Sequence, residues 1–159
     1  MSTLHIFPAS NPALANKILF EFLDICISMK IKTYLVFGTL LGFYRDGTYL
    51  PGDSDIDIYI QCSKYLRNSL ISTLRTKDFE IDTIPGASPS MNIHTLKETI
   101  FIDVWFNFRK SLLNFCTGDN FLTYYKRDIL IPFPVKSYLV CAYDDWMSRI
   151  PKHATPFGK

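Results

Sequence analysis

The segment that most constrains the fold is residues 38–60, GTLLGFYRDGTYLPGDSDIDIYI. It starts with a glycine directly after the apolar run TYLVF and ends with aspartates at alternate positions, Asp53, Asp55 and Asp57. On a β-strand, side chains two positions apart point the same way and lie about 6.5 to 7 Å apart along the chain. The sequence therefore predicts a strand with an acidic face carrying Asp55 and Asp57 and an apolar opposite face, reached from the previous strand through a glycine turn.

Two carboxylates on one strand face repel each other, and each favours protonation unless a cation lies between them. Hard oxygen ligands on a rigid strand suit Mg²⁺ or Mn²⁺, which bind phosphates through the same coordination shell. We therefore predict a magnesium or manganese ion at Asp55 and Asp57 that carries a nucleotide. An isolated D-x-D pair is more often a solvated strand edge or a calcium ligand, so the prediction depends on the rest of the chain.

Asp103 supports a metal site, because it lies in the middle of the apolar segment TIFIDVWFNF at residues 99–108. A lone charge on a central strand would cost several kcal/mol, roughly, unless it is paired or binds a metal. If this strand neighbours the strand of Asp55 and Asp57, three carboxylates converge, which is enough for a two-metal site. Asp103 is then predicted to be a third metal ligand or the general base for the acceptor.

The glycine end of the segment predicts a phosphate-binding turn. A strand that runs into Gly38 and Thr39, followed by a short helix over residues 39–44, presents free backbone N–H groups to an anion. Arg45 follows on the same element and is a fork-shaped donor for a second phosphate contact. Asp53 is placed with these cofactor-binding residues as an auxiliary acid. Taken alone, Gly38 is more often a plain turn and Arg45 a surface ion pair, so the order of the features carries the prediction.

The remainder of the chain predicts one globular domain over residues 1–159, of the α+β (α/β) class. Hydrophobic residues make up 48% of the sequence and charged residues 20%, which is a globular composition. The stripe from Leu14 to Met29, spaced by three and four, predicts a helix that begins at Asn11-Pro12. Helices are expected at 12–30, 39–44, 63–76 and 134–142, and strands at 33–37, 55–60, 79–84, 91–94 and 99–108, with an extended piece within 124–134.

Charge and hydropathy limit the partners. The net charge is +2 without a run of like charges, so nucleic acid binding is not supported. The apolar run at residues 18–29 is interrupted by Glu21 and Asp24, so no membrane span is expected. The start of the sequence lacks a secretory pattern, and the four cysteines form no C-x-x-C pair, so we expect a cytoplasmic protein with reduced thiols.

The order of glycine turn, D-x-D strand and apolar strand with a central aspartate resembles the nucleotidyltransferase fold of DNA polymerase β and its relatives. More closely, residues 38–58 resemble the LicD-type phosphotransferases, which include bacterial phosphocholine transferases and the fukutin-related proteins. Their signature reads approximately GTLLGxxRxxxxIPWDxDxDI. The matching positions are Gly38, Thr39, Leu40, Leu41, Gly42, Arg45, Pro51, Asp53, Asp55 and Asp57. Similar segments follow at Asp103 and at the end, where IPFP and YDDWM resemble the closing part of the family, so that the resemblance covers about residues 15–150.

The resemblance implies a minimal nucleotidyltransferase fold, with helices packed on a mixed sheet, and Mg²⁺-dependent transfer of phosphocholine or an alditol phosphate. Its partners would be a CDP-activated donor and a sugar or glycan hydroxyl. Two departures bear on the substrate: Gly52 stands where the family usually has tryptophan, and Asp144 where it usually has glycine. Two other functions stay open, namely transfer of NMP from an NTP to a small molecule, protein or RNA end, and a catalytically silent nucleotide- or partner-binding domain.

Overall fold

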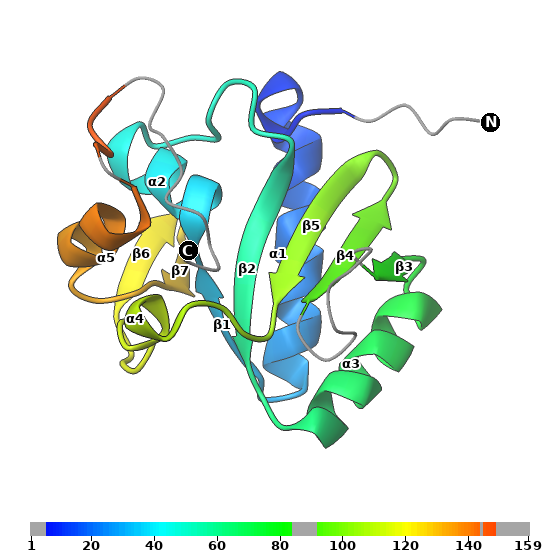
Figure 1. Cartoon of the computed structure of the whole chain (residues 1–159). Helices are drawn as coiled ribbons and strands as arrows, with labels where there is room; N and C mark the ends of the chain where they lie inside the picture. Colours follow the sequence, from blue (N-terminus) through cyan, green and yellow to red (C-terminus); the bar gives the residue numbers. More distant parts are fainter. Residues whose placement is uncertain (1–5, 84–91, 144, 149–159) are drawn as a thin grey trace.

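A mixed sheet forms the centre of the protein in the computed structural model, which describes residues 6–83, 92–143 and 145–148 (Figure 1). The seven strands lie in the order β3-β4-β5-β2-β1-β7-β6. Strand β2 pairs in parallel with β5, and β1 in parallel with β7, while the other neighbours are antiparallel. The strands are β1 Lys32–Leu35, β2 Asp55–Gln61, β3 Glu80–Thr83, β4 Asn92–Lys97, β5 Ile100–Trp105, β6 Phe121–Tyr124 and β7 Arg127–Leu130. The predicted α/β class with a mixed sheet is confirmed.

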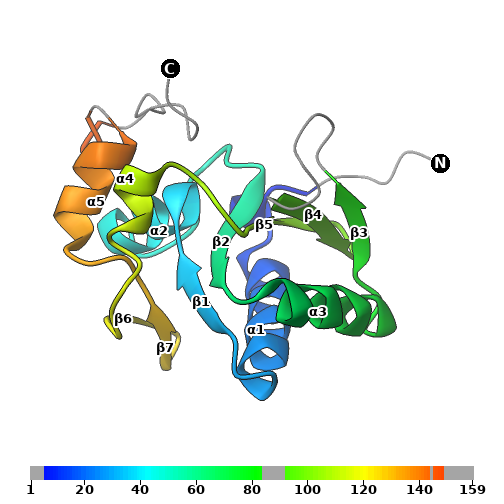
Figure 2. The ribbon, with the colours of Figure 1, turned by 60° about the horizontal axis from the view of Figure 1, so that its bottom comes forward.

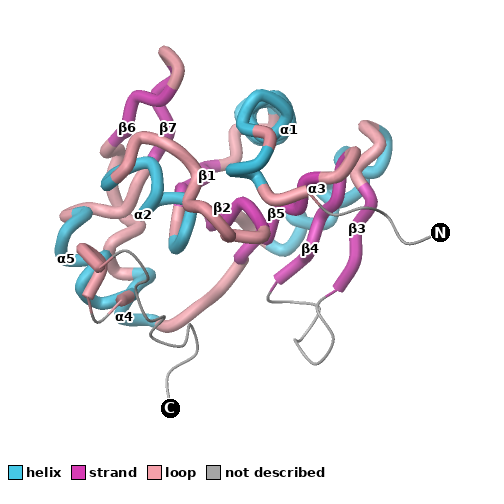
Figure 3. The backbone as a smooth tube through the Cα atoms, turned by 90° about the horizontal axis from the view of Figure 1, so that it is seen from above, coloured by secondary structure: helices cyan, strands magenta, loops and turns pink. Residues whose placement is uncertain are grey.

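The helices lie on both sides of this sheet. Helices α1 Pro12–Ser28 and α3 Lys64–Thr76 pack against each other (Figure 2), and Figure 3 shows α1 on the side of the sheet opposite α4 Lys110–Leu113 and α5 Val135–Ala142. The short helix α2 Phe37–Arg45 lies where β1 ends and contacts β2 and α5. No helix in the described ranges has the length and hydrophobicity that a membrane crossing requires.

Local sequence signals explain where the two long helices begin. The side chain of Asn11 accepts the backbone N–H of Leu14 at 3.2 Å, and proline occupies the first helical position, so α1 starts where the sequence predicts. The hydroxyl of Ser63 accepts the N–H of Leu66 in the same way at the start of α3. Helix α1 ends at Ser28, two residues before the predicted end, because Lys30 has a positive φ of 56° and cannot continue it.

Several predicted boundaries differ from the structure. The strand predicted at 33–37 ends at Leu35, and α2 already begins at Phe37, whose φ of 44° makes the turn that we assigned to Gly38. The 3₁₀ turn η1 Pro8–Ser10, α4 and β6 were not predicted. The strand expected at 91–94 extends to Lys97 as β4, while residues 84 and 91 of the predicted strands lie outside the described residues.

The alternation along β2 separates the core from the site. Ile56, Ile58 and Ile60 are at most 1% exposed and belong to the hydrophobic core. Asp55 and Asp57 alternate with them and therefore point to the opposite face of the sheet. Because β2 is a central strand, the acidic face lies in the middle of the sheet and not at its edge.

Candidate active site

Three carboxylates converge where β2 begins. Asp53 in the preceding loop, and Asp55 and Asp57 on β2, each offer one oxygen, and these oxygens lie within 4.8 Å of one another. An all-oxygen set of this kind suits Mg²⁺ or Mn²⁺ better than zinc, which favours nitrogen and sulfur ligands. The chemistry of the donor set therefore fits the predicted ion.

Asp57 is the most buried member of this carboxylate group, with 8% of its surface exposed. Its burial, and then the negative charges of Asp55, Asp53 and Asp103, raise the pKa of the Asp57 carboxyl well above its ordinary value. Concentrated negative charge that is partly withdrawn from water is costly without a counter-ion. A divalent cation at this position would remove that cost.

Neighbouring donors fix the Asp57 side chain. The backbone N–H of Gly38 donates to Oδ2 at 3.2 Å, and the indole N–H of Trp105 donates to Oδ1 at 3.0 Å. The backbone N–H of Asp57 itself donates to Oγ1 of Thr39 at 2.9 Å. Because donors from α2 and β5 orient both oxygens, Asp57 is held in place before any ligand arrives.

Gly38 also makes room for Asp53. A Cβ atom at residue 38 would lie 2.1 Å from Oδ2 of Asp53, a distance that no side chain permits. The loop between α2 and β2 is held close to the helix at Gly42 too, where a Cβ would lie 2.5 Å from the carbonyl oxygen of Thr48. In this structure the missing side chain at Gly38 therefore leaves room for the Asp53 carboxylate, while phosphate binding at Gly38 and Thr39 stays a prediction.

Asp103 lies beside the carboxylate group on the neighbouring strand. Strand β5 pairs in parallel with β2, and Asp103 is directly opposite Asp57 in the register. The two strands are therefore neighbours, which is the condition that the sequence left open. The group of converging oxygens contains Asp53 and not Asp103, so the role of Asp103 as third ligand or base stays a prediction.

Arg45 is linked to the chain beyond α5. Its Nη1 donates to the carbonyl oxygens of Trp146 at 2.9 Å and Ser148 at 2.6 Å, while Nε and Nη2 bind the carboxylate of Asp46 at 2.9 and 2.8 Å. The predicted phosphate contact of Arg45 is not tested by these bonds. They do show that the guanidinium already connects α2 to a distant part of the sequence.

Aromatic residues form a part of the site that sequence reasoning missed. Trp105 donates to Asp57, and the hydroxyl of Tyr138 accepts the N–H of Phe37 at 3.3 Å. Tyr143 is 1% exposed, and its burial, followed by the charges of Asp57, Asp53 and Asp55, raises the pKa of its phenol. The signal for Trp105 was available, because a residue two positions after Asp103 shares its strand face.

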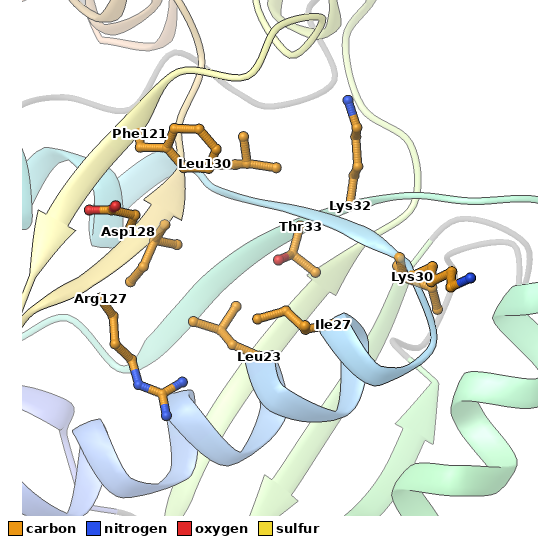
Figure 4. Close-up of a pocket in the computed structure, with 11 residues that line it drawn as sticks. Leu23, Ile27, Lys30, Lys32, Thr33, Phe121, Arg127, Asp128 and Leu130 are labelled. Atoms are coloured by element: carbon orange, nitrogen blue, oxygen red, sulfur yellow. The ribbon is translucent and has the colours of Figure 1, made fainter.

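A cavity elsewhere in the molecule is separate from these residues. It has a volume of about 520 Å³ and lies between α1, β1 and the β6–β7 hairpin. Figure 4 shows Leu23 and Ile27 of α1 pointing toward Thr33 of β1. Lys32 and Thr33 lie at the start of β1, whereas α2 and the carboxylate group follow the other end of this strand. Asp53, Asp55 and Asp57 do not line the cavity.

The matches with known proteins agree with this geometry. The family model of the LicD/FKTN/FKRP nucleotidyltransferase domain matches residues 30–138. The chain belongs to this family. The match contains α2, the carboxylate group, Asp103 and Tyr138, and it ends within α5. The chain is therefore a LicD-family transferase domain.

A solved structure shares the fold of this LicD-family domain. The crystal structure of the lincosamide antibiotic adenylyltransferase LnuA, bound to lincomycin, superposes with a TM-score of 0.51. The superposition covers 78% of this chain and 83% of that chain at 18% sequence identity. The predicted nucleotidyltransferase fold is thereby confirmed. A comparison of the sequence with curated proteins finds no significant match.

Proposed function

We propose that this LicD-family domain is a metal-dependent phosphotransferase. It moves a phosphate-linked group, such as phosphocholine or an alditol phosphate, from a CDP-activated donor to the hydroxyl of a sugar or glycan. The convergence of Asp53, Asp55 and Asp57 carries the proposal, because such a carboxylate group is costly in a protein that binds no cation. Family membership supports transfer as the class of reaction.

The chain's own residues divide the work between metal and substrates. Asp55 and Asp57, with Asp53 or Asp103, would hold Mg²⁺ or Mn²⁺. The ion, when bound, supplies positive charge that stabilises the phosphate oxygens of the donor. Asp103, on the neighbouring strand, accepts the proton of the attacking hydroxyl.

The phosphate contacts belong to α2 in this proposal. The first turn of the helix contains Gly38 and Thr39, and because the N–H of Gly38 already donates to Asp57, a phosphate would share that N–H or use its neighbours. Arg45 lies at the last turn, where its guanidinium binds Asp46 and the carbonyl oxygens of Trp146 and Ser148, so a direct phosphate contact would compete with these bonds. Gly52 adds a difference from the family. Its φ is 80°, and nothing lies within 4 Å of the place where a side chain would begin, so the space beside residue 52 is open. We expect the choice of donor or acceptor to differ from that of relatives with tryptophan.

A donor screen tests the reaction type. The protein is incubated in Mg²⁺ with individual CDP-alcohols and NTPs, and the released nucleotide or pyrophosphate is quantified. Release of CMP from a CDP-alcohol is the expected result. Release of pyrophosphate from an NTP would instead identify an NMP transferase. Absence of turnover together with absence of binding heat for Mg²⁺ and CTP would identify a silent domain.

Substitution of the carboxylates tests the metal assignment. Asp55→Asn and Asp57→Asn should each lower the turnover at least about 100-fold, because each removes a charged ligand from the group. Binding of Mn²⁺, measured by electron paramagnetic resonance, should fall in parallel. Asp78→Asn is the matched control, since Asp78 is exposed and its positive φ of 62° is tolerated by asparagine. Near-wild-type transfer by either site variant would show that the carboxylates do not hold the metal.

A further inference from the structure

We propose that Arg45 is a positioning residue that fastens the segment after α5 to α2, and so keeps Tyr143 packed beside the carboxylate group. The inference rests on the proposed function only for its effect on turnover. Its structural part concerns contacts between residues more than 100 positions apart in the sequence, with separations of 101 and 103. Figure 1 shows the end of the described chain lying over α2 and α5.

The contacts of Arg45 connect two parts of the chain, so Arg45 is not an isolated surface charge. Its side chain is only 14% exposed. Its donors bind two carbonyl oxygens of the closing segment, residues 145–148, and both oxygens of Asp46. Asp46 supplies the opposite charge, so the guanidinium can remain partly buried. Carbonyl oxygens of an irregular segment need such donors when they are withdrawn from water.

The segment that Arg45 holds reaches the site through Tyr143. Helix α5 ends at Ala142, and the N–H of Tyr143 still donates to the carbonyl of Leu139 at 2.9 Å, whereas its φ and ψ of −139° and 139° are extended. Residues 145–148 form a turn, in which the N–H of Ser148 donates to the carbonyl of Asp145 at 3.2 Å. Arg45 therefore binds a turn that lies close to Tyr143 in the sequence.

Tyr143 is 1% exposed although it lies outside the helix, and it directly follows α5, which contacts α2 and whose Tyr138 hydroxyl accepts the N–H of Phe37. In agreement with this packing, burial and then the charges of Asp57, Asp53 and Asp55 raise the pKa of its phenol. The ring of Trp146 adds a second contact to α2, with its centroid 6.0 Å from that of Tyr44. Helix α2 thus holds residues 145–148 through both a polar and an aromatic contact.

Lysine cannot replace arginine in this role. A lysine ammonium is a compact charge on a flexible stem, while the guanidinium reaches two carbonyl oxygens and a carboxylate from one rigid plane. The alternative role, a direct phosphate contact, depends mainly on positive charge. The two roles therefore predict different properties for Arg45→Gln and Arg45→Lys.

Hydrogen exchange with mass spectrometry on the full chain tests the proposal without any substrate. In Arg45→Gln, the amides of Tyr143 and Ser148 should exchange at least about tenfold faster than in the wild type, with α1 and β2 unchanged, since local release is separate from global unfolding. Arg45→Lys should show most of this increase. The control is Arg127→Gln, which removes a similar long-range pair with Asp24, at 2.6 and 3.0 Å, far from the site.

Turnover, once a donor is identified, gives the second readout. If Arg45 acts through Tyr143, the double variant Arg45→Gln/Tyr143→Phe should lose no more activity than the more damaging single variant. Unchanged exchange at Tyr143 and Ser148 in Arg45→Gln would overturn the proposal, even if nucleotide affinity fell. Faster exchange throughout α1 and β2 would overturn it too, because Arg45 would then serve overall stability. Failure of every donor would refute the proposed function but leave the exchange result valid.

Discussion

Asp57 shows how a single residue can be prepared for a metal by its surroundings. Both of its carboxylate oxygens accept N–H groups, from Gly38 and from Trp105. Asparagine at this position has one acceptor and one NH₂ group, so one of the two donors would face another donor. The Asp57→Asn variant therefore loses more than a charge, and Asp55→Asn is the cleaner probe of electrostatics.

Trp105 should set the metal affinity through Asp57. In Trp105→Phe the aromatic ring still packs on Phe37 and Phe108, whose centroids lie 5.1 and 6.5 Å from that of Trp105, but the N–H to Asp57 is lost. Outer-shell partners of metal ligands typically contribute 10- to 100-fold in affinity, and we expect Mn²⁺ to bind about tenfold more weakly.

The two tryptophans of the chain provide the control for this measurement. Trp146→Phe, titrated with Mn²⁺ in the same way, should retain the wild-type affinity, because Arg45 binds the backbone carbonyl of Trp146 and phenylalanine keeps an aromatic ring beside Tyr44. Equal Mn²⁺ affinity in Trp105→Phe and the wild type would show that the indole N–H does not orient the ligand.

At the scale of elements, α2 is the part that assembles the site. The backbone N–H of Gly38 in its first turn donates to Asp57, and the side chain of Asp53 packs against Gly38. Arg45 in its last turn binds the closing segment after α5. One nine-residue helix thus contacts the carboxylate strand at one end and the chain after α5 at the other. A substitution in its first turn should therefore weaken metal binding more than it lowers the stability of the fold.

Gly38→Ala tests this role of α2. The added methyl would lie 2.1 Å from Oδ2 of Asp53, so the Asp53 carboxylate must leave its position. We expect Mn²⁺ affinity to fall at least about tenfold, as for loss of a ligand or its support. Because Asp53 lies in a loop and is half-buried, it can move outward, and the melting temperature should change little.

Gly118→Ala is the matched control for this variant. A methyl group there meets only the terminal Nδ2 atom of the Asn120 side chain, at 2.7 Å, which can rotate away. Metal binding measured by electron paramagnetic resonance should be unaffected in Gly118→Ala. An unchanged Mn²⁺ affinity in Gly38→Ala would mean that Asp53 does not bind the metal.

For the whole molecule, the sequence predicted local structure better than it predicted long-range contacts. The alternation along residues 55–60 identified β2. The isolated charge of Asp103 marked a strand that could neighbour β2, and the register shows that it does, although Asp103 is half-buried and not fully buried. The β6–β7 hairpin was missed at β6, since its two-residue turn is Tyr125-Lys126, with φ values of 48° and 62°. Glycine and asparagine, the usual signals for such a turn, are absent from it.

The contacts of the closing segment could not be predicted for a different reason. Arg45 binds backbone carbonyl oxygens of Trp146 and Ser148, and every residue has such an oxygen. The convergence of Asp53 with β2 depends likewise on how the loop folds back onto α2 at Gly42. The sequence names the residues that can bind a metal, but the path of the loop decides which of them meet.

The carboxylate group should also leave a signature in the stability of the whole protein. Burial and then the charges of Asp55, Asp53 and Asp103 raise the pKa of Asp57, so the folded chain keeps this proton to a higher pH than the unfolded chain, whose aspartates titrate at about 3.9. The contribution of Asp57 to the free energy of unfolding is therefore highest at low pH. It falls as the pH rises from the unfolded value through the raised folded value.

Asp55→Asn should reduce this loss of stability with rising pH, because Asp55 is the neighbouring charge with the largest effect on the pKa of Asp57. In EDTA at pH 7 we expect the variant to be more stable than the wild type by about 1 kcal/mol, the scale of one pKa unit. The difference should vanish as the pH falls below about 3.9, the value at which unfolded aspartates titrate, because Asp57 is then protonated in both the folded and the unfolded chain. Urea unfolding from about pH 3 to about pH 8 measures it, with Asp78→Asn as control.

Saturating Mg²⁺ should reverse the order at pH 7, because an ion that binds only the folded wild type stabilises it by mass action. The variant, which lacks one charged ligand, should gain much less from the same Mg²⁺ concentration. A wild type that is as stable as Asp55→Asn in EDTA and gains nothing from Mg²⁺ would show that the three carboxylates neither repel one another nor share a cation.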